Sequence, residues 1–205
     1  MGATHEQYDR IVRGNIRRMS IRHHRPKAPE LVRAALLEAA ARLLQDGATV
    51  SIGSVAEEAG VSKGAVQHHF ASRSGLFTAL ADELIATFEE DVKAEIGRDP
   101  IRAGAHARAY ARVGARVAIT EYEWSRAVIC ASVAERDVAA RWRNWVQDDL
   151  AHDEGSEAGK IDLLLARLAA DGLWLSDILG TYPLSSDIRE KLLERIEALT
   201  LPAQD

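Results

Sequence analysis

The chain of 205 residues lacks several features that would place it in common protein classes. Its single cysteine, Cys130, cannot form an internal disulfide, and no cysteine and histidine spacing typical of a zinc finger accompanies it. No run of about 18 apolar residues is present, and the N-terminus has no apolar segment of the kind that secretion requires. We therefore expect a cytoplasmic protein that has no membrane partner.

The motifs of common catalytic and metal sites are also missing. There is no serine or cysteine elbow, no paired-carboxylate motif and no glycine-rich phosphate loop. His68 and His69 are adjacent, about 100° apart on a helix, so they do not converge on one ion. His106 and His152 are remote in sequence, and we interpret them as isolated. The sequence predicts no enzyme, no metal site and no cofactor.

Charge is distributed unevenly along the chain. Met1 to Asp82 contain 11 Lys and Arg against 8 Asp and Glu, whereas the remainder contains 15 against 23. The excess of basic residues lies mostly in a flexible N-terminal arm predicted over residues 1–26. Such an arm suits an anionic polymer, although a solvated, disordered tail explains it equally well. The basic residues are Arg10, Arg13, Arg17, Arg18, Arg22, Arg25 and Lys27.

Apolar residues recur with the 3.6-residue period of helices through nearly the whole chain, so we predict an all-α fold of about nine helices. The first helix opens near Pro29 and stops at Asp46 and Gly47. The fourth begins after Ser72 or Ser74 and runs to about Ile96. The later helices are expected over about 101–119, 124–134, 136–152, 160–179 and 187–199, with an acidic loop of small residues, DEGSEAG, before the eighth.

Two short helices between the first and the fourth predict a helix-turn-helix. Ser51 is a good N-cap for the second helix, and Gly60 ends it; Ser62 then caps a third helix over 63–70. Because so few residues separate them, these helices must cross sharply. Val66 and Phe70 lie at i and i+4, so we expect both to point into the core with Val55 and Val61.

The run AEEAGVSKGAVQHHF, from Ala56 to Phe70, resembles the DNA-binding domain of tetracycline-repressor (TetR) family regulators. The segment LARLAADGLWLSDILG, from Leu165 to Gly180, is similar to a common ending in that family. The resemblance implies a helix-turn-helix DNA-binding domain over 27–74 and a helical effector-binding and dimerisation domain over 75–205.

Within the first domain, the resemblance implies that the third helix enters the major groove of double-stranded DNA. Lys63 is then the candidate for reading guanine, and Gln67, where relatives usually have tyrosine, either donates to a phosphate or reads adenine. One histidine of the pair meets phosphate, and the other packs under the helix. Gly53 replaces a larger contacting side chain of many relatives. The full set of implied DNA contacts is Ser51, Ser54, Ser62, Lys63, Gly64, Ala65, Gln67, His68, His69 and Arg73.

Within the second domain, relatives place a small-molecule effector site, and this chain concentrates aromatic residues there. The candidates are Tyr110, Tyr122, Trp124, Trp142 and Trp145, although packing in the core explains each of them as well. Arg112, Arg116 and Arg126 either meet an anionic effector or form salt bridges. Apolar stripes on the last two helices suit a homodimer built as a four-helix bundle, or else they close the core. The dimer candidates are Leu164, Leu168, Leu175, Ile178, Ile188, Leu192 and Ile196.

The function that the resemblance implies is a sequence-specific transcriptional repressor, which binds a palindromic operator as a homodimer and is released by an effector. The alternative is a small-molecule-binding or catalytic helical protein with a degenerate DNA-binding domain, since Gly53 and Gln67 depart from the family pattern.

Overall fold

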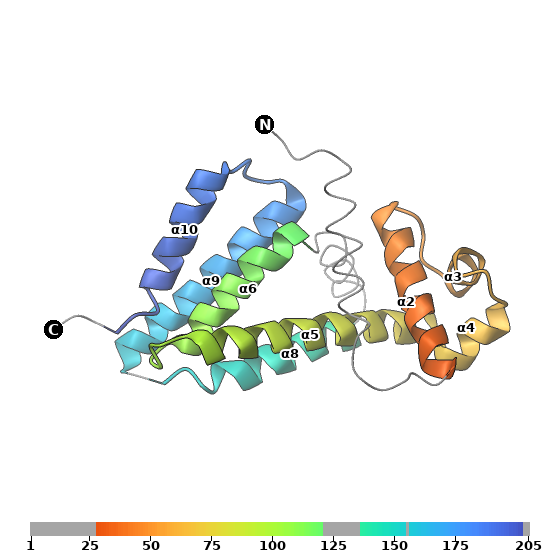
Figure 1. Cartoon of the computed structure of the whole chain (residues 1–205), viewed down its shortest axis with the longest axis horizontal. Coiled ribbons are helices and arrows are strands. Elements are labelled where there is room, and N and C mark those ends of the chain that lie inside the picture. Colours follow the sequence, from red (N-terminus) through yellow and green to blue (C-terminus); the bar gives the residue numbers. More distant parts are fainter. Residues whose placement is uncertain (1–27, 121–135, 155, 203–205) are drawn as a thin grey trace. The chain divides into compact units, whose positions relative to one another are not determined.

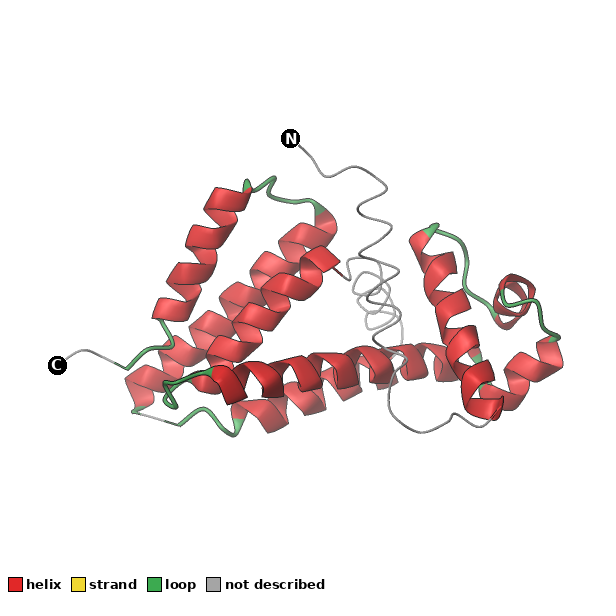
Figure 2. Cartoon of the chain, viewed as in Figure 1, coloured by secondary structure: helices red, strands yellow, loops and turns green. Residues whose placement is uncertain are grey.

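The computed structural model describes residues 28–120, 136–154 and 156–202, and every regular element in these ranges is an α-helix (Figures 1 and 2). The all-α prediction is therefore confirmed. Three features of the sequence analysis lie outside the described residues: the arm predicted over 1–26, the helix predicted over 124–134 and Cys130. The helices are α2 (Ala28–Gln45), α3 (Ile52–Glu58), α4 (Lys63–His69), α5 (Arg73–Arg98), α6 (Ala105–Thr120), α8 (Arg136–Leu150), α9 (Glu157–Leu179) and α10 (Ser186–Ala198).

Serine caps set the beginnings of several helices. The side chain of Ser72 accepts a hydrogen bond from the backbone N–H of Gly75 at 3.0 Å, which settles the start of α5 in favour of Ser72. The side chain of Ser156 accepts from Gly159 N–H at 3.2 Å, and Glu157 lies in the first turn of α9. The predicted acidic loop is therefore wrong in its second half, because this cap draws Glu157 and the next residues into α9.

The described helices fall into two units. One contains α2, α3, α4, α5 as far as Leu84 and the start of α8; the other contains α5 from Ile85, most of α8, and α6, α9 and α10. In the first unit α3 packs against both α2 and α4. In the second, α6 packs along α9, and α10 contacts both of them. One stripe of apolar residues along the long α5 is buried: Leu76, Leu80, Leu84 and Phe88.

A buried arginine joins the beginning of α6 to the end of α10. Arg108 is only 2% exposed; its Nε donates to Asp99 Oδ2 at 2.7 Å, and its Nη1 donates to the carbonyl oxygen of Thr200 at 3.1 Å. This bond from Arg108 holds the pKa of the Asp99 carboxyl below its usual range. Gly104, with a φ of +69°, lies against the same carbonyl group. Any larger residue would place its Cβ 2.0 Å from Thr200 O, so only glycine allows this close approach. None of the described helices is long and apolar enough to cross a membrane.

Candidate functional site

The helix-turn-helix of the first unit is built from two caps and one glycine. Ser51 and Ser54 form a reciprocal capping box at the start of α3, and Ser62 accepts from Ala65 N–H at 3.2 Å at the start of α4. Between the helices Gly60 has a φ of +66°, a conformation that glycine adopts without strain. The chain therefore turns sharply from α3 into α4, as the sequence predicts.

Helix α4 is short, so packing must hold it in place. Val66 is fully buried and Phe70 nearly so, and burying each side chain contributes roughly 1.5–3 kcal/mol. The guanidinium of Arg33 lies over the Phe70 ring, 5.6 Å from its centroid. The prediction that Val61 joins them in the core is wrong: it lies in the turn, and its side chain is 36% exposed.

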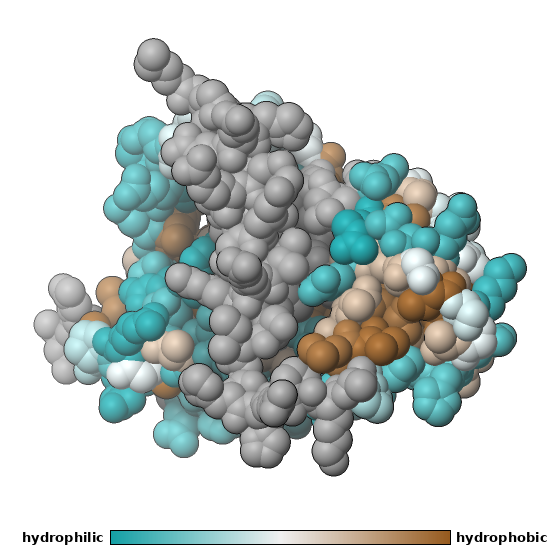
Figure 3. All heavy atoms as spheres, turned by 45° about the vertical axis from the view of Figure 1, so that its right-hand side comes forward, coloured by the Kyte–Doolittle hydropathy of each residue, from teal (hydrophilic) through white to brown (hydrophobic). Residues whose placement is uncertain are grey.

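The opposite face of α4 is polar and open to solvent. Lys63, Gln67 and His68 are exposed, and Ala65 is half-buried. His69 is half-buried and contacts the Phe70 ring at 6.4 Å between centroids. Figure 3, which brings the side with α2, α3 and α4 forward, shows hydrophilic residues around a smaller hydrophobic area. The histidine pair is therefore divided, with His68 facing outward and His69 beside the core.

Lys63 lies against Gly53 of α3, a contact that the sequence did not reveal. A Cβ built at Gly53 would lie 3.2 Å from Lys63 Cε and 3.5 Å from its Nζ. Gly53 therefore leaves room for the lysine stem to rest on α3, which restricts where the ammonium group can lie.

Three of the implied DNA contacts, Ser51, Ser54 and Arg73, differ in how many of their polar atoms already make hydrogen bonds within the protein. The Ser54 hydroxyl donates to the carbonyl oxygen of Thr49 at 2.8 Å, and a hydroxyl has only one proton to donate. Ser51 Oγ accepts from Ser54 N–H at 3.0 Å as part of the capping box. Arg73 is exposed, but its Nε donates to Val50 O at 3.0 Å and its guanidinium lies 4.7 Å from the centroid of Phe77. Thus the guanidinium of Arg73, at the start of α5, is held in one orientation, whereas the hydrogen bonds of Ser54 stabilise the beginning of α3.

In the second unit the predicted aromatic residues form one cluster around Phe88. The Trp142 and Trp145 rings stack at 5.4 Å between centroids, and Tyr110 stacks on Trp145 at 6.2 Å. Phe88 meets all three rings edge to face. Tyr110 is buried, while both tryptophans are half-buried. Tyr122 and Trp124 lie outside the described residues.

A charged network borders this aromatic cluster. The Tyr110 hydroxyl donates to Asp171 Oδ1 at 2.5 Å, and the guanidinium of Arg167 lies 5.0 Å from the centroid of the Tyr110 ring. Burial, and secondarily the neighbouring Asp171, raise the pKa of Tyr110; burial also raises the pKa of Asp171. Arg167 donates in a fork to both carboxylate oxygens of Asp153, at 2.8 and 3.1 Å.

Salt bridges account for two of the three arginines that were candidates for an anionic effector; the third, Arg126, lies outside the described residues. Arg112 lies 2.6 Å from Glu197, and Arg116 lies 3.0 Å from Glu95. Each guanidinium therefore already has a carboxylate partner within the second unit.

The outward face of α9 and α10 is apolar. Leu164, Leu168 and Leu175 of α9 and Ile188 and Leu192 of α10 are all exposed, as are Ile161, Leu165 and Leu179. Two of the predicted dimer residues differ: Ile178 is 3% and Ile196 is 7% exposed, because both pack into the core of their own unit. These two side chains are therefore not part of the exposed apolar face.

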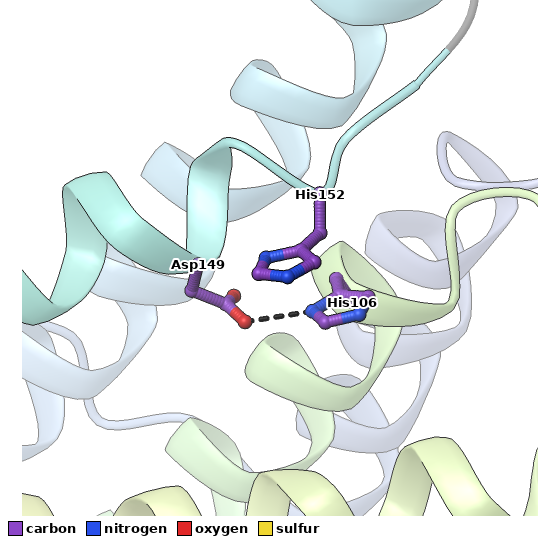
Figure 4. A group of neighbouring side chains, drawn as sticks. All are labelled: His106, Asp149 and His152. Atoms are coloured by element: carbon purple, nitrogen blue, oxygen red, sulfur yellow. Dashed lines mark hydrogen bonds and ion pairs between the residues drawn. The ribbon is translucent and has the colours of Figure 1, made fainter.

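The interpretation of His106 and His152 as isolated is wrong. His106 of α6 and His152, which follows α8, stack with ring centroids 4.5 Å apart, and Asp149 lies beside them (Figure 4). His106 Nδ1 and Asp149 Oδ1 are 2.7 Å apart. The residues come together only because α6 and α8 share one unit, and no local spacing in the sequence signals this.

The fold and the polar face of α4 define a helix-turn-helix DNA-binding regulator with a separate helical unit. Two family models match the chain: the tetR family of bacterial regulatory proteins over residues 36–80, and the tetracyclin repressor-like C-terminal domain over 104–201. The chain belongs to the TetR family of transcriptional regulators. The family and the general function predicted from the sequence are therefore confirmed.

Solved structures of regulators agree with this assignment. A TetR family member from Streptomyces coelicolor A3 is 25% identical, with a TM-score of 0.62, covering 80% of this chain and 97% of its own. The multidrug binding protein EbrR, complexed with ethidium, is 26% identical, with a TM-score of 0.57 and coverage of 84% and 99%. A transcriptional regulator from Rhodococcus sp. is similar in fold, at 24% identity and a TM-score of 0.58, covering 85% and 96%. A comparison with proteins of curated function found no match.

Proposed function

We propose that this protein is a repressor that binds a palindromic operator as a homodimer and releases it when a small-molecule effector binds the second unit. The observation that carries this proposal is α4: its buried Val66 fixes the helix, while Lys63, Gln67 and His68 face solvent. The function is binding rather than catalysis, and it is exercised in the cytoplasm, where a bacterial chromosome lies.

The proposed base contacts lie at the N-terminal part of α4. Lys63 donates to the O6 and N7 acceptors of a guanine, and Gln67 reads an adenine or donates to a phosphate. The small Gly64 and Ala65 allow the backbone to approach the groove, and Ala65 contacts a thymine methyl. Their exposed or half-exposed positions support this assignment.

Phosphate contacts would flank the base contacts. His68, which is exposed, and Arg73, whose guanidinium is oriented by Val50 O, are the best placed. Ser62 keeps a hydroxyl proton to donate, because it accepts rather than donates in its cap. The Ser51 hydroxyl lies 3.1 Å from Ser54 Oγ and donates to it, since Ser54 gives its own proton to Thr49 O. Ser54 and the half-buried His69 would position α3 and α4 instead.

The homodimer would form through α9 and α10. Exposed leucines recur along α9, and an exposed isoleucine and leucine lie on α10. An apolar face of this extent on a helical unit usually binds a partner. Pairing these helices with those of a second copy would give a four-helix bundle. Two copies of α4 spaced by about 34–36 Å, one turn of DNA, would read two half-sites.

The effector would be an aromatic small molecule that binds at Trp142 and Trp145. Both rings are half-buried and stack on each other, and Trp145 also stacks on Tyr110, which gives an aromatic surface suited to a flat ligand. The similarity to EbrR, complexed with ethidium, supports an aromatic ligand. Helix α5 is one continuous helix that contributes residues to both units, so it can carry the response. A ligand would release the operator only if its affinities for the DNA-bound and the free arrangements of the dimer differ.

The experiment is selection of genomic DNA fragments by the purified full chain over a series of salt concentrations. We expect a palindromic site and an affinity that falls steeply with salt, because Lys and Arg contacts release counterions from the phosphates. Fragments without sequence preference at low salt would contradict the proposal. Ligands that quench tryptophan fluorescence are then tested at fixed salt, where a bound effector should weaken operator binding.

A further inference from the structure

We propose that His106, Asp149 and His152 bind a divalent transition-metal ion such as Zn²⁺. One ligand atom from each residue lies within 4.8 Å of the others, and Figure 4 shows the two imidazoles and the carboxylate gathered at one place on α6 and the end of α8. The proposed metal site does not depend on whether the protein binds DNA.

The hydrogen bonds of His152 leave one ring nitrogen with a lone pair for a metal. His152 Nδ1 lies 3.1 Å from the carbonyl oxygen of Asp148. A carbonyl cannot donate, so Nδ1 must carry the proton, and in the neutral ring Nε2 is then unprotonated. A backbone carbonyl that fixes the tautomer in this way is typical of histidines that ligate metals.

Asp149 presents its two oxygens to different partners. Oδ1 faces His106, whereas Oδ2 lies 2.8 Å from Arg167 Nη1, in a geometry that makes an ion pair but no hydrogen bond. Asp149 is about nine-tenths buried, so its charge has little access to water. Arg167 divides its single charge between Asp149 and Asp153, which leaves an excess of negative charge that a cation would offset.

The shift needed to close the site is small. A tetrahedral zinc ion with bonds of about 2.0–2.2 Å places its ligand atoms roughly 3.3–3.6 Å apart. The ion would take the place of the proton between His106 Nδ1 and Asp149 Oδ1, which are 2.7 Å apart. Because the two imidazoles are parallel within 3°, one ring must also turn so that both planes contain the ion.

The donor set favours particular ions. Two imidazoles with one carboxylate suit Zn²⁺, Co²⁺ or Ni²⁺, whereas Mg²⁺ and Ca²⁺ prefer oxygen ligands alone. Three protein ligands leave at least one position of the ion for water or another small ligand. The site lies in the same unit as the aromatic cluster.

The test is metal binding by the purified, chelator-treated full chain. Zn²⁺ affinity is measured by competition with a chromophoric chelator, and Co²⁺ is followed by its visible absorption. We expect one ion per chain. His152→Ala and Asp149→Asn should each weaken binding at least about tenfold, and Mg²⁺ should not compete. His152→Ala is the decisive variant, because its side chain is exposed and its loss leaves the core packing intact.

Two matched variants separate this site from general effects of charge and histidine content. Asp162→Asn removes the same charge from an exposed residue of α9 in the same unit, and His68→Ala removes an exposed histidine of the other unit; both should leave Zn²⁺ affinity within about twofold of wild type. The proposal is overturned if wild type binds no Zn²⁺ at about 100 μM. It is also overturned if His152→Ala binds as wild type does, since the ion would then lie elsewhere in the chain.

Discussion

Helices α4 and α9 each bury one side in their own unit and expose the other, but the two exposed sides differ in chemistry. On α4 the exposed side carries Lys63, Gln67 and His68; on α9 it carries a series of leucines, of which Leu168 is 59% exposed. A cationic, hydrogen-bonding surface loses little in water and gains against an anionic, polar partner. A row of leucines gains only when another apolar surface covers it. The same secondary structure thus suits DNA in one unit and a second protein chain in the other.

The largest effect is expected from a charge on the apolar face. Leu168→Asp should shift the chain to a monomer and raise the dimer dissociation constant at least about a hundredfold, because both symmetry-related leucines lose roughly 1.5–3 kcal/mol of burial. Sedimentation or light scattering measures the shift, and operator affinity should fall with it. Asn144→Asp places the same charge on an exposed position of α8 and should leave the dimer intact. A dimer that persists in Leu168→Asp would show that α9 is exposed for another reason.

A smaller, position-specific effect is expected on α4. Lys63→Ala should reduce discrimination at one base pair of each half-site by about ten- to a hundredfold, because the guanine loses its donor. Selection of randomised operators measures this directly. Lys93→Ala removes an exposed lysine of α5 and serves as the control. If Lys63→Ala weakens all sequences equally, Lys63 contacts phosphate, and the base-reading role is wrong.

The smallest effect is expected at Gly53, beneath the lysine. Gly53→Ala would place a Cβ 3.2 Å from Lys63 Cε, so the flexible stem must move by a few tenths of an ångström. We expect less than about a tenfold change in preference, confined to the base pair that Lys63 reads, and no further change when Lys63 is already alanine. Gly97→Ala, with no atom near the added group, is the matched control. Additive effects of Gly53→Ala and Lys63→Ala would indicate that the two residues act separately.

The sequence predicted local features better than it predicted contacts between distant segments. Caps such as Ser51 and Ser62 act within three residues, so they are visible in the sequence and fix the helix-turn-helix. The contact of Lys63 with Gly53 depends on how α3 and α4 cross, and the meeting of His106 with His152 depends on the packing of α6 and α8. Periodicity also marks apolar faces without saying what covers them, which is why Ile178 and Leu168 looked equivalent although only one is buried.

Arg108 makes the end of α10 integral to the second unit. A guanidinium this deeply buried needs every acceptor it has, and two of them, the carbonyl oxygen and Oγ1, belong to Thr200. Shortening the chain to residue 199 would leave the pair of Arg108 with Asp99 in place but would remove both acceptors of Thr200, so the buried Nη1 of Arg108, about 90 residues away in sequence, would lose two of its hydrogen bonds. For anyone who trims this protein for expression or attaches a tag, Thr200 therefore marks the last position at which the chain can be cut without damaging its interior.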